Sequence, residues 1–393
     1  MTARKALLAA LLVSIASPAL AQGDFRSCLA GLRGEAAGKG VSGSTFDSAT
    51  ASLQPDMKVL ELMDNQPEFK TPIWDYLAML VDDERVEDGR AAMRRWGQAL
   101  ATAESRYGVD RYVIAGVWGV ESNFGKDLGG RPLVQSLATL SCYANRRRDY
   151  FRAELMATLR IIENGDIDPS RLSGSWAGAF GQTQFMPSTY QRLAVDLDGD
   201  GRRDIVDSAP DALGSTANFL RKASWVTGLP WGYEVRVPAG VTAGGRKAKK
   251  PLSAWAAQGV TRIDGRPLSG DYQAGLIMPA GRNGPGFLVT RNFDALYSYN
   301  GAESYGLAIS VLSDRLRGGA GVQGDWPTDD PGLTRAERRE LMSLLARRGY
   351  DVGEPDGRIG QKTRDAIKDV EGRLGMRPTG RPGGKVLDSL RRG

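Results

Sequence analysis

Histidine is absent from all 393 residues of the chain, and this absence excludes several kinds of chemistry. A Ser-His-Asp triad and a Cys-His pair both need an imidazole to take the proton from the nucleophile. Catalytic zinc sites nearly always include histidine, so zinc-dependent catalysis is a poor candidate as well. Carboxylate chemistry remains, and glycosidic bonds are among the bonds that enzymes cleave with carboxylates.

Cysteine is almost as scarce, because the sequence contains only Cys28 and Cys142. Without a histidine to activate it, neither is expected to be a catalytic thiol. An even pair of cysteines in an oxidising compartment usually forms a disulfide. We therefore expect a Cys28–Cys142 bond that ties the N-terminal arm to the middle of the chain.

Long apolar runs are missing except at the N-terminus. Arg4 and Lys5 precede an apolar run over residues 6–16, and residues 18–21 (PALA) end in an A-x-A site. This pattern predicts a secretory signal peptide over residues 1–21, which is too short for a stable membrane anchor. We expect a periplasmic protein that has no stable membrane anchor and is a monomer.

The overall composition is that of an ordinary globular protein, with 41% hydrophobic and 25% charged residues. The formal net charge is +6, and it becomes +4 without residues 1–21, because that segment contains Arg4, Lys5 and no acid. A mildly basic exported protein suits a polyanionic partner such as a cell wall, although the same charge also serves solubility. Nucleic acid is not an expected partner in that compartment.

The first chemical motif is a glutamate at the end of an apolar helix. Residues 113–120 are apolar on every side, which predicts a buried helix that delivers Glu121 at its end. A carboxyl at the edge of a buried element is desolvated, and desolvation raises its pKa toward the range that a general acid needs. Taken alone, such a glutamate is more often an ordinary helix-end residue.

The second motif covers residues 174–190 (GSWAGAFGQTQFMPSTY), where small residues alternate with aromatic ones. Small residues let a polymer approach the backbone closely, and aromatic rings offer apolar faces to sugar rings. Ser175 and Gln184 are placed to hydrogen-bond polar groups. The alternative for this segment is a glycine-rich packing turn with no ligand.

Together, these motifs resemble the soluble lytic transglycosylase B family, within the lysozyme-like superfamily. The resemblance covers roughly residues 25–316 and implies a mainly α fold, in which a lysozyme-like catalytic domain includes a few short strands. It is carried by residues 62–66 (LMDNQ), 119–122 (GVES), 137–141 (LATLS), 174–179 (GSWAGA), 184–188 (QFMPS) and 299–300 (YN).

The resemblance implies that Glu121 is the one catalytic carboxylate of a lytic transglycosylase. It would protonate the glycosidic oxygen between N-acetylmuramic acid and N-acetylglucosamine, and then take the proton of the muramoyl C6 hydroxyl to close a 1,6-anhydro ring. A hydrolytic muramidase on the same fold and a non-catalytic wall-binding protein are the alternatives. The residues implied in substrate binding are Tyr76, Ser175, Gln184, Tyr299, Asn300 and Tyr305.

The sequence departs from the family pattern at three places. Gln182 and Thr183 replace a more usual Tyr-Gly, and Ala302 replaces a serine. Phe219 stands where an aromatic residue with a hydroxyl is common. These departures affect the expected substrate contacts and leave the expected chemistry unchanged.

Residues 196–207 (DLDGDGRRDIVD) match the start of an EF-hand loop, with acids at positions one, three and five and glycine at six. We expect a structural Ca²⁺, because such a cluster of acids is electrostatically costly without a cation. The alternative is a solvated acidic turn. Either Asp207 or Asp211 would close the loop, and Asp211 is narrowly favoured. The expected ligands are Asp196, Asp198, Asp200, the Arg202 carbonyl and Asp211.

The chain is expected to divide into a catalytic region over residues 22–317, a Gly/Pro/Asp-rich linker over 318–332 and a C-terminal domain over 333–393. Residues 341–350 and 355–367 resemble the small three-helix peptidoglycan-binding domain of wall enzymes. The usual Phe-Gln of that domain is Val370-Glu371 in this sequence. The resemblance implies peptidoglycan as the partner, and a helical bundle without a ligand is the alternative.

Overall fold

The structure is a computed structural model, and it describes residues 18–63 and 71–392. Most of the predicted signal peptide, residues 1–17, lies outside the described residues, as do residues 64–66 of the LMDNQ motif. Helix α1 (Pro18–Gly38) spans the predicted cleavage point after Ala21. Within the described residues, no helix has both the length and the apolar character needed to cross a membrane.

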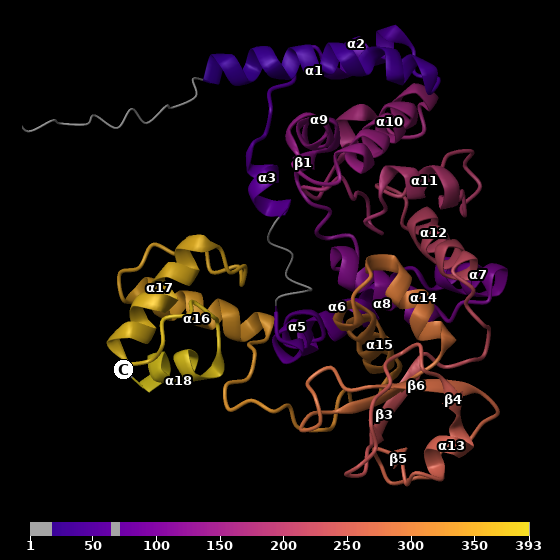
Figure 1. Cartoon of the computed structure of the whole chain (residues 1–393), viewed down its shortest axis with the longest axis vertical. Coiled ribbons are helices and arrows are strands. Elements are labelled where there is room, and N and C mark those ends of the chain that lie inside the picture. Colours follow the sequence, from indigo (N-terminus) through magenta and orange to yellow (C-terminus); the bar gives the residue numbers. More distant parts are fainter. Residues whose placement is uncertain (1–17, 64–70, 393) are drawn as a thin grey trace, which may run out of the picture.

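The described chain is mainly helical with a few short strands, so the expected fold class is confirmed. At one end of the molecule, α1 and α2 (Gly43–Thr50) cover α9 (Leu133–Tyr143) and α10 (Arg148–Asn164) (Figure 1). The short helix α3 (Lys58–Met63) packs beside α9. The predicted disulfide joins Cys28 of α1 to Cys142 of α9, across 114 residues of sequence.

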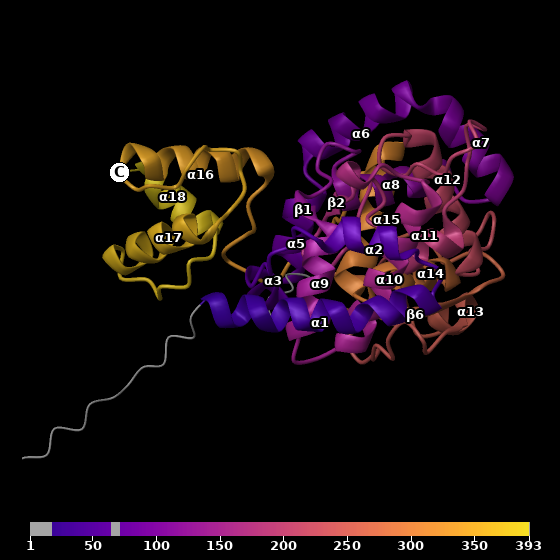
Figure 2. The same ribbon diagram turned by 90° about the horizontal axis from the view of Figure 1, so that it is seen from above.

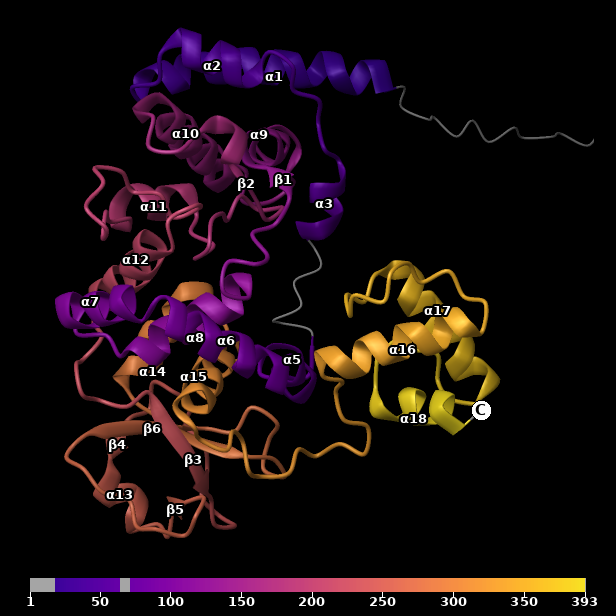
Figure 3. The same ribbon diagram turned by 180° about the vertical axis from the view of Figure 1, so that it is seen from behind.

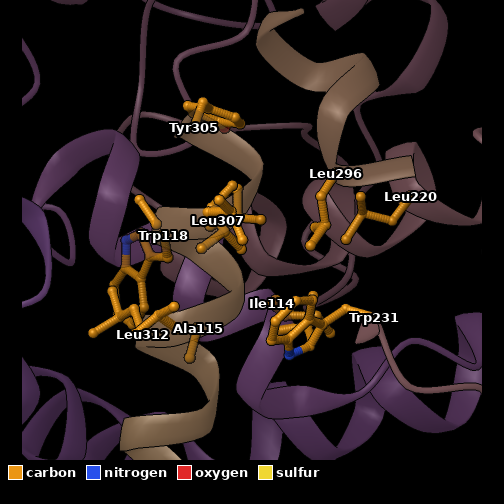
Figure 4. Close-up of a cluster of buried hydrophobic side chains, with 14 of the residues drawn as sticks. Ile114, Ala115, Trp118, Leu220, Trp231, Leu296, Tyr305, Leu307 and Leu312 are labelled. Carbon is orange, nitrogen blue, oxygen red and sulfur yellow. The ribbon is translucent and has the colours of Figure 1, made fainter. Parts of the chain in front are cut away.

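The centre of the molecule is built on the contact between α8 (Arg111–Ser122) and α15 (Glu303–Arg317). Ile114, Ala115 and Trp118 of α8 meet Leu307 and Leu312 of α15 in a continuous buried cluster (Figure 4). The apolar run before Glu121 is therefore a buried helix, as its pattern predicts. The other helices of this layer are α5 (Ile73–Leu80), α6 (Asp83–Arg95), α7 (Gly97–Tyr107), α12 (Ala209–Lys222) and α14 (Arg291–Asn300).

The glycine-rich motif lies between these two helical layers. Strand β1 (Arg131–Pro132) pairs with β2 (Ser173–Gly174), and the segment after β2 turns into α11 (Pro187–Leu193). The short 3-10 helix η1 (Pro169–Arg171) precedes β2. A separate apolar cluster that includes Phe180, Phe185 and Tyr190 fills this region.

A small antiparallel sheet lies at the opposite end from α1 and carries α13 (Leu252–Ala256) (Figure 1). The strand order is β4-β6-β7-β3-β5 among the described residues. Its core gathers Val235, Trp255, Leu276 and Leu288. The strands are β3 (Gly232–Arg236), β4 (Lys250–Pro251), β5 (Thr261–Arg262), β6 (Gln273–Ile277) and β7 (Gly286–Val289).

The C-terminal unit, residues 333–392, has its own apolar core beside the rest of the molecule (Figures 2 and 3). It consists of α16 (Arg335–Arg347), α17 (Gln361–Arg373) and α18 (Gly384–Arg392). The segment before it follows the sheet, because the backbone N–H groups of Gln323 and Gly324 donate to the Glu234 carboxylate.

Charged side chains hold the C-terminal unit against α5 and α6. Arg381 donates to both oxygens of Asp75 on α5, at 2.6 and 2.5 Å, and also pairs with Asp330. Arg339 forms a two-bonded pair with Glu84 at the start of α6. Because α5 also carries Tyr76, the C-terminal unit is attached directly to an element of the candidate site.

We predict that Arg381→Met lowers the free energy of unfolding by about 2 kcal/mol, because Asp75 and Asp330 would then face each other without a cation in a partly buried contact. Arg373→Met is the matched control, since its pair with Asp369 is largely exposed, and we expect a change within about 0.5 kcal/mol. Denaturant unfolding of the whole chain measures both. Equal effects of the two variants would contradict the prediction.

Candidate active site

Glu121 lies in the last turn of α8, at the edge of the central core. Asp110 caps the start of this helix by accepting a hydrogen bond from the backbone N–H of Tyr112. The helix ends at Asn123, whose left-handed backbone (φ 50°) turns the chain away directly after the glutamate. The Glu121 side chain is half-buried, so it remains accessible while its stem is held by the core.

Tyr305 is the partner of Glu121 on the facing helix. Its ring is only 2% exposed, and its hydroxyl donates to the Glu121 carboxylate. Burial first, and then the negative charge of Glu121, hold the pKa of Tyr305 well above its usual value. The phenol therefore keeps its proton and remains a hydrogen-bond donor to the glutamate.

Two more tyrosines extend this group. Tyr299 stacks on Tyr305 with ring centroids 6.1 Å apart, and its hydroxyl donates to the Thr183 carbonyl at 2.8 Å. Burial and the charge of Glu121 raise the pKa of Tyr299 as well. Tyr76 of α5 is buried and near enough to Tyr305 to raise its pKa. Of the predicted substrate-binding residues, the structure thus gathers Tyr76, Tyr299 and Tyr305 around Glu121.

Phe219 of α12 packs against Tyr299, with ring centroids 4.5 Å apart. Its ring also contacts Phe185 from the glycine-rich segment. Because phenylalanine has no hydroxyl, this position supplies an apolar wall behind the tyrosines and cannot donate a hydrogen bond.

Gln182 and Ser122 fasten the glycine-rich segment to the end of α8, and the sequence did not point to this role. The Gln182 side chain accepts from the Trp118 indole at 3.0 Å, and the Ser122 hydroxyl donates to the Gln182 carbonyl at 2.6 Å. Gln182 stood out in the sequence only as a departure from the family pattern. A backbone carbonyl is present in every residue, so a hydrogen bond to the Gln182 carbonyl leaves no signal in the sequence.

Ser175, Gln184 and Asn300 have other surroundings. The Ser175 hydroxyl accepts from the backbone N–H of Ala179, and the Gln184 amide donates to the Gly181 and Leu128 carbonyls. Asn300 is exposed at the last residue of α14. None of these three is hydrogen-bonded to Glu121 among the contacts that the described residues show.

The glycine-rich segment also contains a tightly packed turn, which was the alternative interpretation of its glycines. A Cβ atom on Gly174 would lie 2.1 Å from the Ala179 carbonyl oxygen, so no side chain fits at this position. At Gly181 the backbone has a φ of +73°, and a Cβ atom would lie 2.8 Å from Ile205. Close packing therefore explains these two glycines, while Ser175 and Gln184 keep partly accessible side chains.

The acidic loop gathers Asp196, Asp198, Asp200 and Asp211, and one carboxylate oxygen from each lies within 4.8 Å of those of the other three. Asp211 is fully buried and accepts from the backbone N–H groups of Leu197 and Asp204. Burial raises the pKa of Asp211 to about 6. This donor set of convergent oxygens fits a hard cation such as Ca²⁺.

Asp207, the other candidate to close the acidic loop, points elsewhere and pairs with Arg171 at 2.5 Å. Arg202 donates its backbone N–H to Asp200. The loop is also tied to the site, because the Ile205 carbonyl accepts from the Gln182 backbone N–H and the Val206 carbonyl accepts from its side-chain amide.

In the C-terminal unit, Val370 and Glu371 both belong to the interior. Val370 lies in the core, and Glu371 is 3% exposed. The Glu371 carboxylate accepts from the backbone N–H groups of Thr379 and Gly380 and from the Thr379 hydroxyl. The departure from Phe-Gln therefore places a carboxylate that organises the following loop.

Comparison with known families agrees with this architecture. The family model described as the transglycosylase SLT domain matches residues 24–314. The family model described as a putative peptidoglycan binding domain matches residues 334–390. The chain is also 34% identical over 268 residues to the membrane-bound lytic murein transglycosylase B of Escherichia coli (strain K12), covering 66% of this chain and 73% of that protein.

Solved structures show the same similarity. SltB3 from Pseudomonas aeruginosa, in complex with NAG-anhNAM-pentapeptide, has 43% sequence identity and a TM-score of 0.75, covering 93% of this chain and 99% of that one. The Escherichia coli lytic transglycosylase SLT35, in complex with calcium, has 30% identity and a TM-score of 0.65, covering 75% of this chain and 93% of that one.

Proposed function

Since the chain belongs to the lytic murein transglycosylase family, we propose that Glu121 is the single catalytic acid and base of this enzyme. The enzyme cleaves the β-1,4 bond between N-acetylmuramic acid and N-acetylglucosamine in peptidoglycan and forms 1,6-anhydromuramoyl ends. The observation that carries the assignment is the hydrogen bond from the buried Tyr305 hydroxyl to Glu121, at the end of a buried helix.

The proposed reaction uses Glu121 in both protonation states. The protonated carboxyl gives its proton to the glycosidic oxygen, and the bond to the muramoyl C1 breaks with oxocarbenium character. The carboxylate then takes the proton of the muramoyl C6 hydroxyl, whose oxygen bonds to C1. No water is consumed, and Glu121 ends in the protonated state in which it began. A hydrolytic muramidase would instead add water at C1.

We expect Glu121→Gln to abolish release of anhydro-muropeptides from purified sacculi, because an amide can neither give nor take the proton. Glu87→Gln is the matched control, since Glu87 is exposed on α6, and it should keep wild-type activity. Mass spectrometry of the products is the measurement. Reducing muropeptides from the wild-type enzyme would support the hydrolytic alternative, and unchanged activity of Glu121→Gln would support the non-catalytic one.

We expect Tyr305→Phe to lower kcat about tenfold, which corresponds to about 1.4 kcal/mol for the lost hydrogen bond to a charged group. Tyr107→Phe on α7 serves as a control for removing a partly buried tyrosine hydroxyl outside the site. Initial rates on solubilised glycan strands measure both variants. A wild-type kcat in Tyr305→Phe would show that the hydroxyl has no part in the reaction.

Further features complete the proposal. The residues proposed to contact the glycan are Tyr76, Ser175, Gln184, Tyr299, Asn300 and Tyr305.

Residues 333–393 form the wall-binding domain, which residues 318–332 join to the catalytic region (22–317). A second binding site on the same polymer raises the local concentration of the enzyme. The protein is a monomer exported to the periplasm by the signal peptide 1–21.

A structural Ca²⁺ in the acidic loop is also part of the proposal, and the structure of the calcium complex of SLT35 supports it. Asp196, Asp198, Asp200 and Asp211 would hold the ion together with the Arg202 carbonyl. Arg202 stands at position seven of the loop, where an EF-hand supplies a backbone carbonyl. The ion would offset the mutual repulsion of four carboxylates. It would act on stability, because it orders a loop whose Val206 carbonyl accepts from the Gln182 side-chain amide.

We expect Ca²⁺ at about 100 times its Kd to stabilise the chelator-treated protein by about 2.7 kcal/mol, seen as a rise in Tm. Asp211→Asn should lose this rise, while Asp207→Asn should keep it, because Asp207 pairs with Arg171. The reverse pattern would assign the loop closure to Asp207. If Ca²⁺ does not raise the Tm of the wild-type protein, the loop is a solvated acidic turn.

A further inference from the structure

A hollow of about 750 Å³ opens between the first turn of α5 and the first turn of α15. The two helices that border it also carry site residues, because Ser304 directly precedes Tyr305 on α15 and Trp74 lies two residues before Tyr76 on α5. Six of its nine lining residues are apolar. The lining residues are Thr71, Pro72, Ile73, Trp74, Pro279, Ala280, Glu303, Ser304 and Pro327.

Glu303 is the one ionisable side chain among the described lining residues of this hollow. It is half-buried, and burial raises its pKa above the usual value, against a smaller opposing effect of Arg246. Within the described part of the chain, Glu303 makes no hydrogen bond or ion pair of its own. Its charge is therefore partly withdrawn from water without a direct partner.

The neighbouring cations already have partners. Arg246 and Lys249 both pair with Asp294, at 2.9 and 2.6 Å, and the Arg246 guanidinium lies over the Tyr297 ring at 3.6 Å. Arg246 lies close enough to oppose the rise in the pKa of Glu303, and among the described residues no hydrogen bond or ion pair joins the two. A cation that entered the hollow would find the Glu303 carboxylate available.

The position of Glu303 in its helix accounts for part of its presence. It is the first residue of α15, where the helix dipole favours an acid by about 0.3–1 kcal/mol. That effect is satisfied equally well by a carboxylate turned to bulk water. It gives no reason for a partly desolvated carboxylate that lines a hollow between two helices of the candidate site.

We propose that this hollow is a subsite for the peptide stem of peptidoglycan, in which Glu303 pairs with the ammonium group of a diamino acid. The inference rests on the proposed function, since it requires the glycan to be bound at Glu121. The sugar backbone of the substrate carries no cation, so an amine can come only from the peptide substituent. The apolar walls around Pro72, Ile73 and Pro279 suit the methylene chain that carries such an amine.

The test compares kcat/KM on native glycan strands with kcat/KM on strands whose stem amines have been acetylated. We expect the wild-type enzyme to prefer the native strands about fivefold, which corresponds to about 1 kcal/mol for a partly exposed ion pair. Glu303→Gln should reduce this preference to about one. Glu87→Gln, which removes an exposed carboxylate of the same kind, should keep it.

Two results would overturn the subsite: equal cleavage of both substrates by the wild-type enzyme, or a preference that survives in Glu303→Gln. A third substrate, strands freed of their stems by an amidase, separates a peptide contact from a sugar contact. If Glu303→Gln slows cleavage of all three substrates by one factor, the carboxylate binds sugar hydroxyls and the proposal fails.

Controls keep these outcomes distinct from a folding defect and from failure of the proposed function. Glu303→Asp retains the charge and should retain part of the preference, so it replaces Glu303→Gln if the latter has a lowered Tm. Glu121→Gln should abolish cleavage of all three substrates. If it stays active, the assignment of Glu121 is wrong, while the effect of Glu303 on substrate preference is measured independently.

Discussion

The close approach of α8 and α15 is the constraint on which the rest of the site depends. A Cβ atom on Gly116 would lie 2.9 Å from the Ile309 carbonyl oxygen, and one on Gly119 would lie 2.8 Å from the Leu312 side chain. The two glycines thus let the helices pack nearly backbone to backbone. This packing brings the end of α8 beside the first turn of α15, so that Glu121 and Tyr305 meet.

A second set of contacts connects the acidic loop to the end of α8. The carbonyls of Ile205 and Val206 hold Gln182, which accepts from Trp118 and whose carbonyl accepts from Ser122. Ser122 directly follows Glu121. A cation that orders the loop would therefore help to fix the position of the glutamate through these hydrogen bonds of Gln182.

The features that the sequence predicted correctly are those with a local pattern. The apolar run before Glu121 predicted a buried helix, and the even cysteine pair predicted the Cys28–Cys142 bond. Apart from the disulfide, the contacts between distant residues described above left no pattern in the sequence. Arg381 and Asp75 are 306 residues apart, and the partner of Tyr299 is a backbone carbonyl. These pairs follow from the tertiary fold. It brings together elements whose own sequences do not indicate a partner.

The surroundings of Glu121 and Glu303 suit the different tasks that are proposed for these two half-buried carboxylates. Glu121 faces phenols whose pKa values are raised, so these groups stay neutral and donate to it. Neutral donors permit both protonation states, because a hydroxyl can rotate to accept once the carboxyl is protonated. A cation would hold the glutamate ionised and prevent its action as an acid. Among the described residues, Glu303 accepts no such hydrogen bond, and a carboxylate without a partner suits the pairing with a cation that is proposed for it.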